Sequence, residues 1–435
     1  MNSKIFKAEA ADCILLKGGR LVDPQTGTDE KADLLIESGK ITKIGKIDEK
    51  TIEGRVVDCK GKIIAPGFID MHVHLREPGE EHKETIESGC NAAMNGGFTG
   101  VAPMPNTTPV TDQRNHVTFI NRQAKGHLVD VYPIGAITKG LKGEELAEMG
   151  EMKVEGAVAF SDDGRPVESG QVMRRAMEYG NMLGAAIINH AEDLAITGAG
   201  VMNESFSSTE TGFRGIPSVS ESAMVARDVL LAEFTRCPVH IAHVSTKESV
   251  RLIRDAKSRN VKVTAETCPH YLTMTDKAVK TFNTNTKMKP PLRTEEDRLA
   301  LIEAVADGTI DAIATDHAPH HEDDKDNDYH SAAFGVIGLE TAVGVVLDRL
   351  VQSGQLTLET MIERFAVAPR RIFHLPEVKL ETGSEASLTL LDTEKKWTVK
   401  GREFASLSFN TPFEGWALTG GPAGVINKGQ LYLND

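Results

Sequence analysis

Residues 156–190 read GAVAFSDDGRPVESGQVMRRAMEYGNMLGAAIINH, and this stretch contains the unit from which we predict the fold. It begins and ends with short apolar runs, GAVAF and AAIINH, and the apolar residues of the segment QVMRRAMEYGNMLG have helical spacing. A strand, a helix and a second strand in this order predict a βαβ unit with two parallel strands. Each run is followed or ended by a side chain that can bind a metal or carry a proton.

The same alternation continues through the middle of the chain. Eight apolar runs alternate with segments of helical spacing, and no glycine-rich phosphate loop follows any of them. Eight such runs predict a closed (β/α)8 barrel of the TIM type, of class α/β, in preference to an open doubly wound sheet. The runs are residues 67–73, 98–104, 129–134, 156–160, 185–190, 238–244, 261–266 and 310–315.

Both ends of the chain have a different pattern. Their short apolar segments are broken by Gly, Asp and Pro, which is typical of short antiparallel strands. Neither end has enough strands to bury a face alone. We therefore expect residues 1–64 and 376–435 to form one small composite β-sandwich, with residues 65–375 as a catalytic barrel inserted into it.

The overall composition excludes some classes of partner. A formal net charge of −14 is unfavourable for binding nucleic acid or an anionic membrane surface. The five cysteines have no CxxC spacing, which favours reduced thiols over a disulfide framework. Without a continuous apolar segment of about 18 residues or a leader-like start, we expect a cytoplasmic protein that acts on a small molecule.

Metal-binding residue types stand at the ends of five of the eight runs. In a barrel of this type the carboxyl ends of all strands meet on one face, where catalytic residues lie. One histidine at a strand end is usually a satisfied polar residue, but four histidines and two carboxylates together suit Zn²⁺ or a similar ion. The six are His72, His74, His190, His243, Asp316 and one member of the pair Asp162 and Asp163.

Six ligands exceed what a single catalytic zinc ion uses while it keeps an open position. Two ions about 3.5 to 4 Å apart, bridged by a carboxylate and a hydroxide, would use all six and provide a nucleophile without a serine or cysteine. We therefore predict two Zn²⁺ per chain.

Several strings together resemble the dihydroorotases of bacteria, within the amidohydrolase superfamily. They are GFIDMHVHLREPG (67–79), PMPNT (103–107), FSDDG (160–164), HAED (190–193), HVST (243–246), KPPLR (289–293) and ATDHAPHH (314–321). The resemblance implies that His72, His74 and Asp316 bind one zinc and that His190 and His243 bind the other. It favours Asp163 over Asp162 as the bridge. Many relatives use a carbamylated lysine from the fourth strand instead, and its absence here speaks against an allantoinase or a hydantoinase.

The resemblance also implies a set of substrate contacts. Arg76 and Asn106 would hold a substrate carboxylate, since a guanidinium can donate two charge-assisted hydrogen bonds to it. His320 would be a further contact, and the backbone around Phe334 and Gly335 would receive the amide edge of a pyrimidine ring. Lys289 stands where the family often has Asn, and it offers a cation without an acceptor. The acidic run 321–328 is predicted to be a solvated loop that covers the substrate.

The implied reaction is the reversible cyclisation of N-carbamoyl-L-aspartate to L-dihydroorotate in de novo pyrimidine (UMP) biosynthesis. Asp316 would carry the proton between the attacking water and the ring nitrogen. Two alternatives remain open. One is an allantoinase or dihydropyrimidinase, and the other is an inactive homologue that serves as a scaffold for aspartate transcarbamoylase. A homodimer is expected, and an association with aspartate transcarbamoylase is left open.

Overall fold

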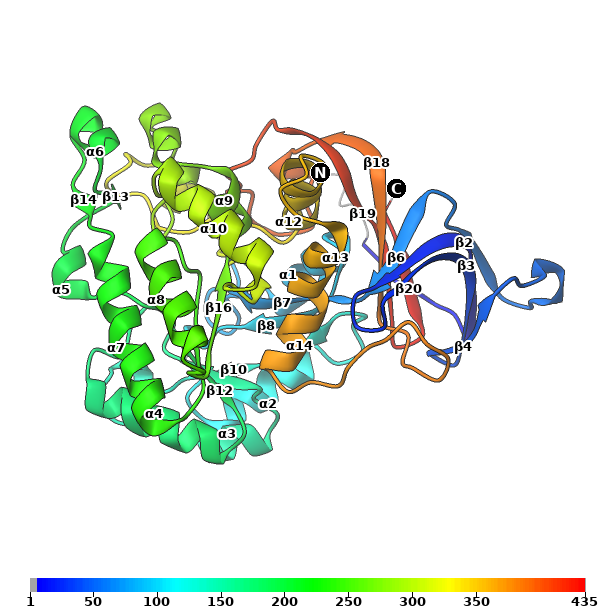
Figure 1. Cartoon of the computed structure of the whole chain (residues 1–435), viewed down its shortest axis with the longest axis horizontal. Coiled ribbons are helices and arrows are strands. Elements are labelled where there is room, and N and C mark those ends of the chain that lie inside the picture. The colour runs from blue at the N-terminus through cyan, green and yellow to red at the C-terminus, as the bar shows by residue number, and fades with distance from the viewer. Residues whose placement is uncertain (1–5, 435) are drawn as a thin grey trace.

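The computed structural model describes residues 6–434, and short parallel strands covered by helices lie at its centre (Figure 1). The hydrogen-bonded neighbours run β7 to β8 to β9, and β10 to β11, β12, β15, β16 and β17. They are β7 (Phe68–Val73), β8 (Phe98–Pro103), β9 (Asp130–Val131), β10 (Ile134–Gly135), β11 (Ala159–Ser161), β12 (Ala186–Asn189), β15 (Val239–Ile241), β16 (Val263–Thr267) and β17 (Ala312–Ile313).

The ring closes where its last strand meets its first. Val73 forms a parallel bridge with His317, just after β17, and the His74 N–H donates to the His317 carbonyl at 2.8 Å. β9 lies within the third apolar run and β10 begins at its last residue, so each of the eight predicted runs supplies one position in the ring. The predicted barrel is confirmed.

Helices connect the strands and cover the outside of the ring. They are α1 (Ile86–Asn95), α2 (Arg114–Gln123), α3 (Met149–Val154), α4 (Gly170–Met182), α7 (Val219–Thr235), α8 (Lys247–Ser258), α10 (Glu295–Asp307), α12 (Ala342–Val346), α13 (Leu358–Ile362) and α14 (Ala368–Ile372). Shorter elements lie in the loops beyond the carboxyl ends of the strands. They are α5 (Leu194–Thr197), β13 (Met202–Asn203), α6 (Phe206–Thr211), β14 (Gly215–Ile216), α9 (Pro269–Thr273) and α11 (Glu322–Lys325).

Local sequence signals explain where the covering helices begin. The Thr246 side chain accepts a hydrogen bond from the Ser249 N–H at the start of α8, and Thr294 and Asp297 form a capping box at the start of α10. α8 then turns Val250, Ile253 and Ala256 toward the core at helical spacing. The N-cap Thr246 lies three residues after His243, so α8 begins close to the end of the sixth barrel strand.

A second, mainly antiparallel sheet combines strands from both ends of the chain, with the order β1-β20-β19-β18-β6-β2-β3-β4 and β5 beside β2. β18 pairs with β6, and β1 pairs with β20. Its strands are β1 (Glu9–Ala10), β2 (Cys13–Asp23), β3 (Thr28–Glu37), β4 (Lys40–Gly45), β5 (Arg55–Asp58), β6 (Lys62–Pro66), β18 (Leu388–Thr398), β19 (Ala417–Asn427) and β20 (Gln430–Leu433).

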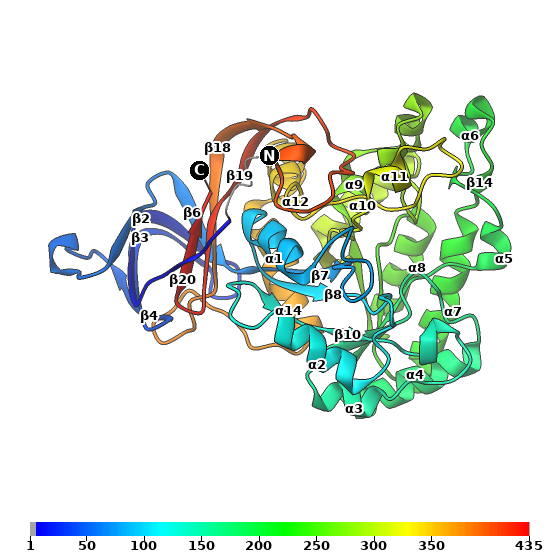
Figure 2. The ribbon, with the colours of Figure 1, turned by 180° about the vertical axis from the view of Figure 1, so that it is seen from behind.

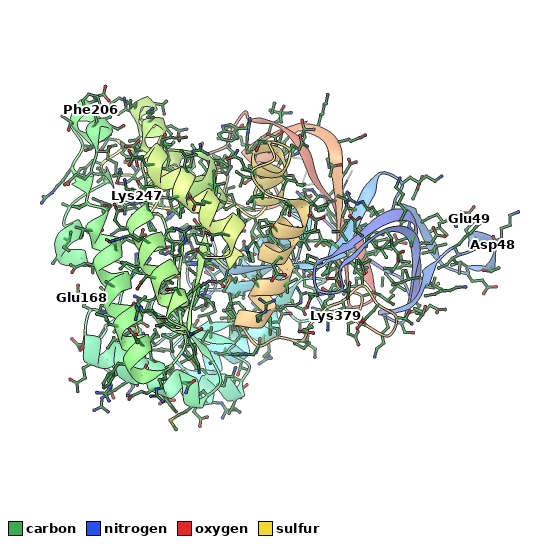
Figure 3. All side chains as sticks on the ribbon, in the orientation of Figure 1. Asp48, Glu49, Glu168, Phe206, Lys247 and Lys379 are labelled. Carbon is green, nitrogen blue, oxygen red and sulfur yellow. The ribbon has the colours of Figure 1, made fainter. Side chains whose placement is uncertain are left out.

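This sheet has a hydrophobic core of its own, which includes Ile14, Leu34, Ile64, Leu390 and Ile426. Figure 3 places Asp48 and Glu49, in the connection between β4 and β5, at one end of the long axis of the molecule and Phe206 of α6 at the other. We propose that the boundaries between this unit and the barrel lie close to those expected from the sequence, 64/65 and 375/376, with β6 continuing the sheet to Pro66. Within residues 6–434, no helix is long and apolar enough to cross a membrane.

Candidate metal centre

Asp163 lies at the centre of the carboxyl-end face of the barrel. It follows β11, and four imidazole nitrogens surround its carboxylate. The Oδ1 atom is 3.5 Å from His72 Nε2, 3.4 Å from His190 Nδ1 and 3.4 Å from His243 Nε2, and Oδ2 is 3.5 Å from His74 Nε2. Two groups of three potential ligands result, and Asp163 belongs to both: it is grouped with His72 and His74, and with His190 and His243.

Asp316 completes the arrangement from the end of the eighth strand. Its Oδ1 atom lies 3.0 Å from His74 Nε2 and 3.5 Å from His72 Nε2. The backbone is left-handed at Asp316 and at His243, with φ of 49° and 34°. Such a conformation is unfavourable for residues other than glycine and is often found at functional sites.

The hydrogen bonding of these side chains tests whether they suit a metal. Among the described residues, His72 Nε2 and Asp163 Oδ1 are buried polar atoms without a hydrogen-bond partner, although they face each other. A buried polar atom left unpaired costs about 1–3 kcal/mol. Zinc ligands lie about 2.0–2.2 Å from the ion, and the separations of 3.4–3.5 Å between the imidazole nitrogens and the Asp163 oxygens are compatible with an ion between them. The donor set therefore fits divalent ions between the imidazoles and the carboxylates.

The far side of three of these imidazole rings is held by an oxygen acceptor. His72 Nδ1 is 2.6 Å from Glu266 Oε1, His74 Nδ1 is 2.9 Å from Asn106 Oδ1, and His190 Nε2 is 3.1 Å from Glu192 Oε2. A ring N–H donated to such an acceptor leaves the lone pair of the other nitrogen directed at the centre.

Glu266 and Glu192 were not predicted from the sequence. The sequence does contain a signal for each of these residues: Glu266 ends the seventh apolar run, and Glu192 lies in the HAED string.

The charges at the centre compensate one another. Burial alone would raise the pKa of Asp163, but the neighbouring His72, His190 and His243 outweigh it and hold the pKa well below its usual range. Burial opposes protonation of His190, yet Asp163 and Glu192 raise its pKa to about 9. The pocket therefore keeps its carboxylates ionised and favours positive charge, as a cation site requires.

Asp162 points elsewhere, although it is the neighbour of Asp163. Its Oδ1 atom accepts the N–H groups of Ile137 at 2.8 Å and of Thr138 at 2.9 Å, and its other oxygen accepts the Thr138 hydroxyl. Burial raises its pKa to about 6. The structure thus places Asp163 among the imidazoles and Asp162 against the loop after β10.

Arg76 lies beside the metal centre, with its side chain only 10% exposed. Its Nε donates to the Pro319 carbonyl at 3.1 Å, and its Nη2 is 3.4 Å from His320 Nε2. The ion pair that it makes with Glu80 is long, at 4.0 Å. A buried guanidinium with so distant a counter-charge is suited to binding an anion.

The other predicted contacts take part in bonds within the protein. Asn106 supports His74, and the Lys289 ammonium lies 3.1 Å from Glu192 Oε1. The Phe334 carbonyl is 2.8 Å from His320 Nε2, and the Gly335 N–H donates to the Lys287 carbonyl at 3.0 Å. A ring amide would have to replace these bonds in order to use the same groups.

The loop after β17 is only partly the solvated segment that its acidic run predicts. Glu322, Asp323, Asp326 and Asp328 are exposed, but Lys325 is buried. Its ammonium donates to the carbonyls of Ala333 at 2.8 Å and Gly335 at 2.9 Å.

Known proteins give the context for this centre. A family model described as dihydro-orotase-like matches residues 61–249. The chain is 52% identical to a dihydroorotase of Geobacter metallireducens, with 96% of this chain and 99% of that protein covered. It is 53% identical to a dihydroorotase of Geobacter sulfurreducens (96% and 98% covered) and 49% identical to one of Acetivibrio thermocellus (97% and 99% covered).

Solved structures agree on the fold. L-hydantoinase (dihydropyrimidinase) from Arthrobacter aurescens superimposes with a TM-score of 0.85 at 28% identity, covering 96% of this chain and 95% of that one. Dihydropyrimidinase from Brevibacillus agri superimposes with a TM-score of 0.84 at 21% identity, with 96% and 94% covered, and supports the fold alone. The near full-length identity to the curated relatives shows that the chain belongs to the dihydroorotase family of cyclic amidohydrolases.

Proposed function

We propose that the chain is a zinc-dependent dihydroorotase that interconverts N-carbamoyl-L-aspartate and L-dihydroorotate in pyrimidine biosynthesis. The observation that supports this most directly is the position of Asp163 between two pairs of imidazoles, with the buried Arg76 beside them. His72, His74 and Asp316 would hold one ion, His190 and His243 the other, and Asp163 would bridge them. When bound, the ions would activate water and polarise the ring carbonyl.

The residues of the chain then have distinct tasks. Asp316 Oδ1 is positioned to accept a proton from the attacking water and to return it to the ring nitrogen that leaves. Burial would raise the pKa of Asp316, but His74, His72 and His243 lower it, so that this carboxylate is ionised and able to accept. Asn106 and Glu266 hold the rings of His74 and His72 in the required orientation.

Arg76 would distinguish dihydroorotate from rings without a carboxylate. The Pro319 carbonyl takes its Nε donor. The N–H groups that remain on the two terminal nitrogens can bind a carboxylate with charge-assisted hydrogen bonds. An allantoinase or a dihydropyrimidinase acts on a ring that lacks the carboxylate. In such an enzyme the buried guanidinium would have no anionic group of the substrate to bind.

The test is ring opening of dihydroorotate by the purified protein, with allantoin and dihydrouracil as competing substrates and the metal content measured on the same sample. We expect turnover of dihydroorotate and about two equivalents of zinc per chain. Faster turnover of allantoin or dihydrouracil than of dihydroorotate would favour an allantoinase or a dihydropyrimidinase. A fully zinc-loaded protein that opens none of the three rings would point to the inactive scaffold.

We further propose that the protein acts in the cytoplasm as a homodimer. An association with aspartate transcarbamoylase is a separate question that a binding experiment answers. The net charge of −14 supports a small-molecule partner rather than nucleic acid or an anionic membrane. Light scattering on the protein alone, and on its mixture with aspartate transcarbamoylase, measures both associations.

A further inference from the structure

The connection between β18 and β19 leaves the antiparallel sheet and crosses to the barrel. Figure 2 shows it extending from β18 toward α11. We refer to residues 404–411 as the crossing segment. Ser406 donates its hydroxyl to Glu84, and Ser408 donates to the Lys83 carbonyl at 2.8 Å, in the loop that follows β7. A segment of the C-terminal sheet is therefore seated on the face of the barrel that carries the metal centre.

Asn410 is a buried residue of the crossing segment, with 3% of the residue exposed. Its Oδ1 accepts the His320 N–H at 3.2 Å, and its Nδ2 donates to the carbonyls of Ala318 at 3.1 Å and Gly335 at 3.2 Å. Its own carbonyl accepts the Ile337 N–H at 3.2 Å. The carboxamide thus binds both the beginning and the end of the loop after β17.

The loop held by Asn410 carries the groups that surround Arg76. The Pro319 carbonyl accepts the Arg76 Nε–H, and Pro319 lies between Ala318 and His320, which Asn410 binds. The His320 ring lies 3.4 Å from Arg76 Nη2 and 2.8 Å from the Phe334 carbonyl. A shift of this loop would move the guanidinium relative to the metal centre without touching a metal ligand.

We propose that Asn410 is a positioning residue for substrate binding, through which the C-terminal sheet completes the carboxylate-binding side of the site. The proposal rests on the proposed function, because it assigns Asn410 a task in holding the loop that orients Arg76. Loss of the carboxamide should weaken the binding of dihydroorotate and leave the metal centre intact.

The chain provides a matched control in Asn427, a second buried asparagine of the same region with 6% exposed. Its Nδ2 donates to the carbonyls of Leu128 at 2.9 Å and Thr99 at 3.3 Å, and to Asp130 at 2.9 Å. These partners lie at the beginnings of β8 and β9, on the opposite face of the barrel from the metal centre. Asn427 therefore joins the same two units and makes no contact with the loop after β17.

The experiment compares Asn410→Ala, Asn410→Asp and Asn427→Ala in the full-length, zinc-loaded enzyme. Metal content, thermal midpoint, kcat and KM for dihydroorotate, and hydrogen exchange over residues 317–337 are measured on each. For Asn410→Ala we expect KM to rise about tenfold or more, kcat to change far less, zinc to stay bound and exchange in the loop to accelerate. Asn427→Ala should lower the thermal midpoint without changing KM or loop exchange.

Asn410→Asp separates the effect of the hydrogen bonds from that of side-chain packing, because the Asp and Asn side chains have nearly the same shape. It keeps the acceptor for the His320 N–H but loses both donors to Ala318 and Gly335. We expect a rise in KM here too, and this variant decides the question if the alanine variant does not fold.

A KM for both Asn410 variants no higher than that of Asn427→Ala, or zinc lost in parallel with activity, would overturn the proposal. If the wild-type enzyme does not act on dihydroorotate, the proposed function fails. The exchange data still test separately whether Asn410 holds the loop.

Discussion

Asp162 and Asp163 show how two adjacent residues of the same type come to have different tasks. Both acids lie just past β11, where Asp163 begins a turn. The Asp163 carboxylate meets the four imidazoles, whereas Asp162 meets the backbone of Ile137 and Thr138. Under the proposed function, only Asp163 is therefore placed to bridge two ions.

The first prediction compares the two acids. Asp163→Ala should reduce the zinc content from about two equivalents to one or fewer and abolish activity, because both ions would lose a ligand. Asp162→Ala should retain zinc but lose about 2–4 kcal/mol of stability, since it leaves buried N–H donors unpaired. Elemental analysis and chemical denaturation measure these effects. Equal zinc loss from both variants, or the reverse order, would show that the bridge is assigned to the wrong residue.

The second prediction concerns the charge of Arg76. A charge-assisted hydrogen bond contributes about 1.5–3 kcal/mol, so Arg76→Met should raise the KM for dihydroorotate about a hundredfold. Hydrolysis of dihydrouracil, which lacks the carboxylate, should change far less, and Arg76→Lys should fall between wild type and Arg76→Met. Measuring kcat/KM for both rings decides the matter. A parallel loss on both rings would mean that Arg76 supports the loop or the fold instead of binding the substrate.

Among the elements, the loop after β17 is held by buried lysines in addition to the Asn410 carboxamide. The Lys325 ammonium binds the carbonyls of Ala333 and Gly335, and the Lys287 ammonium binds those of His330 and Ala332 at 2.8 and 2.6 Å. Lys287 also lies over the Phe334 ring, 4.4 Å from its centre. Ammonium groups thus satisfy backbone acceptors that have no partner in regular structure.

The third prediction tests this role. Lys325→Met preserves the apolar length of the side chain but removes its donors. The Ala333 carbonyl then loses its lysine donor, and the Gly335 carbonyl keeps only the Asn410 carboxamide. Faster hydrogen exchange across residues 329–337 and a lower thermal midpoint are expected. Lys280→Met is the control, because Lys280 makes an exposed ion pair with Glu210 and should change neither quantity. Unchanged exchange in Lys325→Met would show that other contacts hold the loop.

The barrel could be predicted at the level of elements because its signals are local. Each apolar run, such as GAVAF or AAIINH, has the length of one strand, and the metal-binding side chains follow at its end. Glu266 also stands at the end of such a run, but this position alone does not show that it supports His72, and Asn410 lies in none of the eight runs. A carboxylate in an apolar run becomes meaningful only when His72 lies opposite, and Asn410 meets its partners across the boundary between the sheet and the barrel.

For the molecule as a whole, the fourth prediction is that metal removal lowers stability. Without ions, His72 Nε2 and Asp163 Oδ1 remain buried and unpaired. An ion present at a hundred times its Kd stabilises the folded state by about 2.7 kcal/mol. Chelation should therefore lower the thermal midpoint by several degrees, and added zinc should restore it. Scanning calorimetry measures this, with Asp163→Ala as a control that should respond less. An unchanged midpoint in protein shown to be free of metal would contradict it.

The pairing of β18 with β6 also affects how the chain is made on the ribosome. β6 is synthesised before the barrel, whereas its partner β18 is synthesised after it. At roughly 5–20 residues per second, the open edge of β6 must wait on the order of tens of seconds for that partner. An unpaired edge strand is prone to association with other chains. Nascent chains stalled before Leu388 should therefore bind chaperones and be cleaved readily by protease, and release of the complete chain should end both.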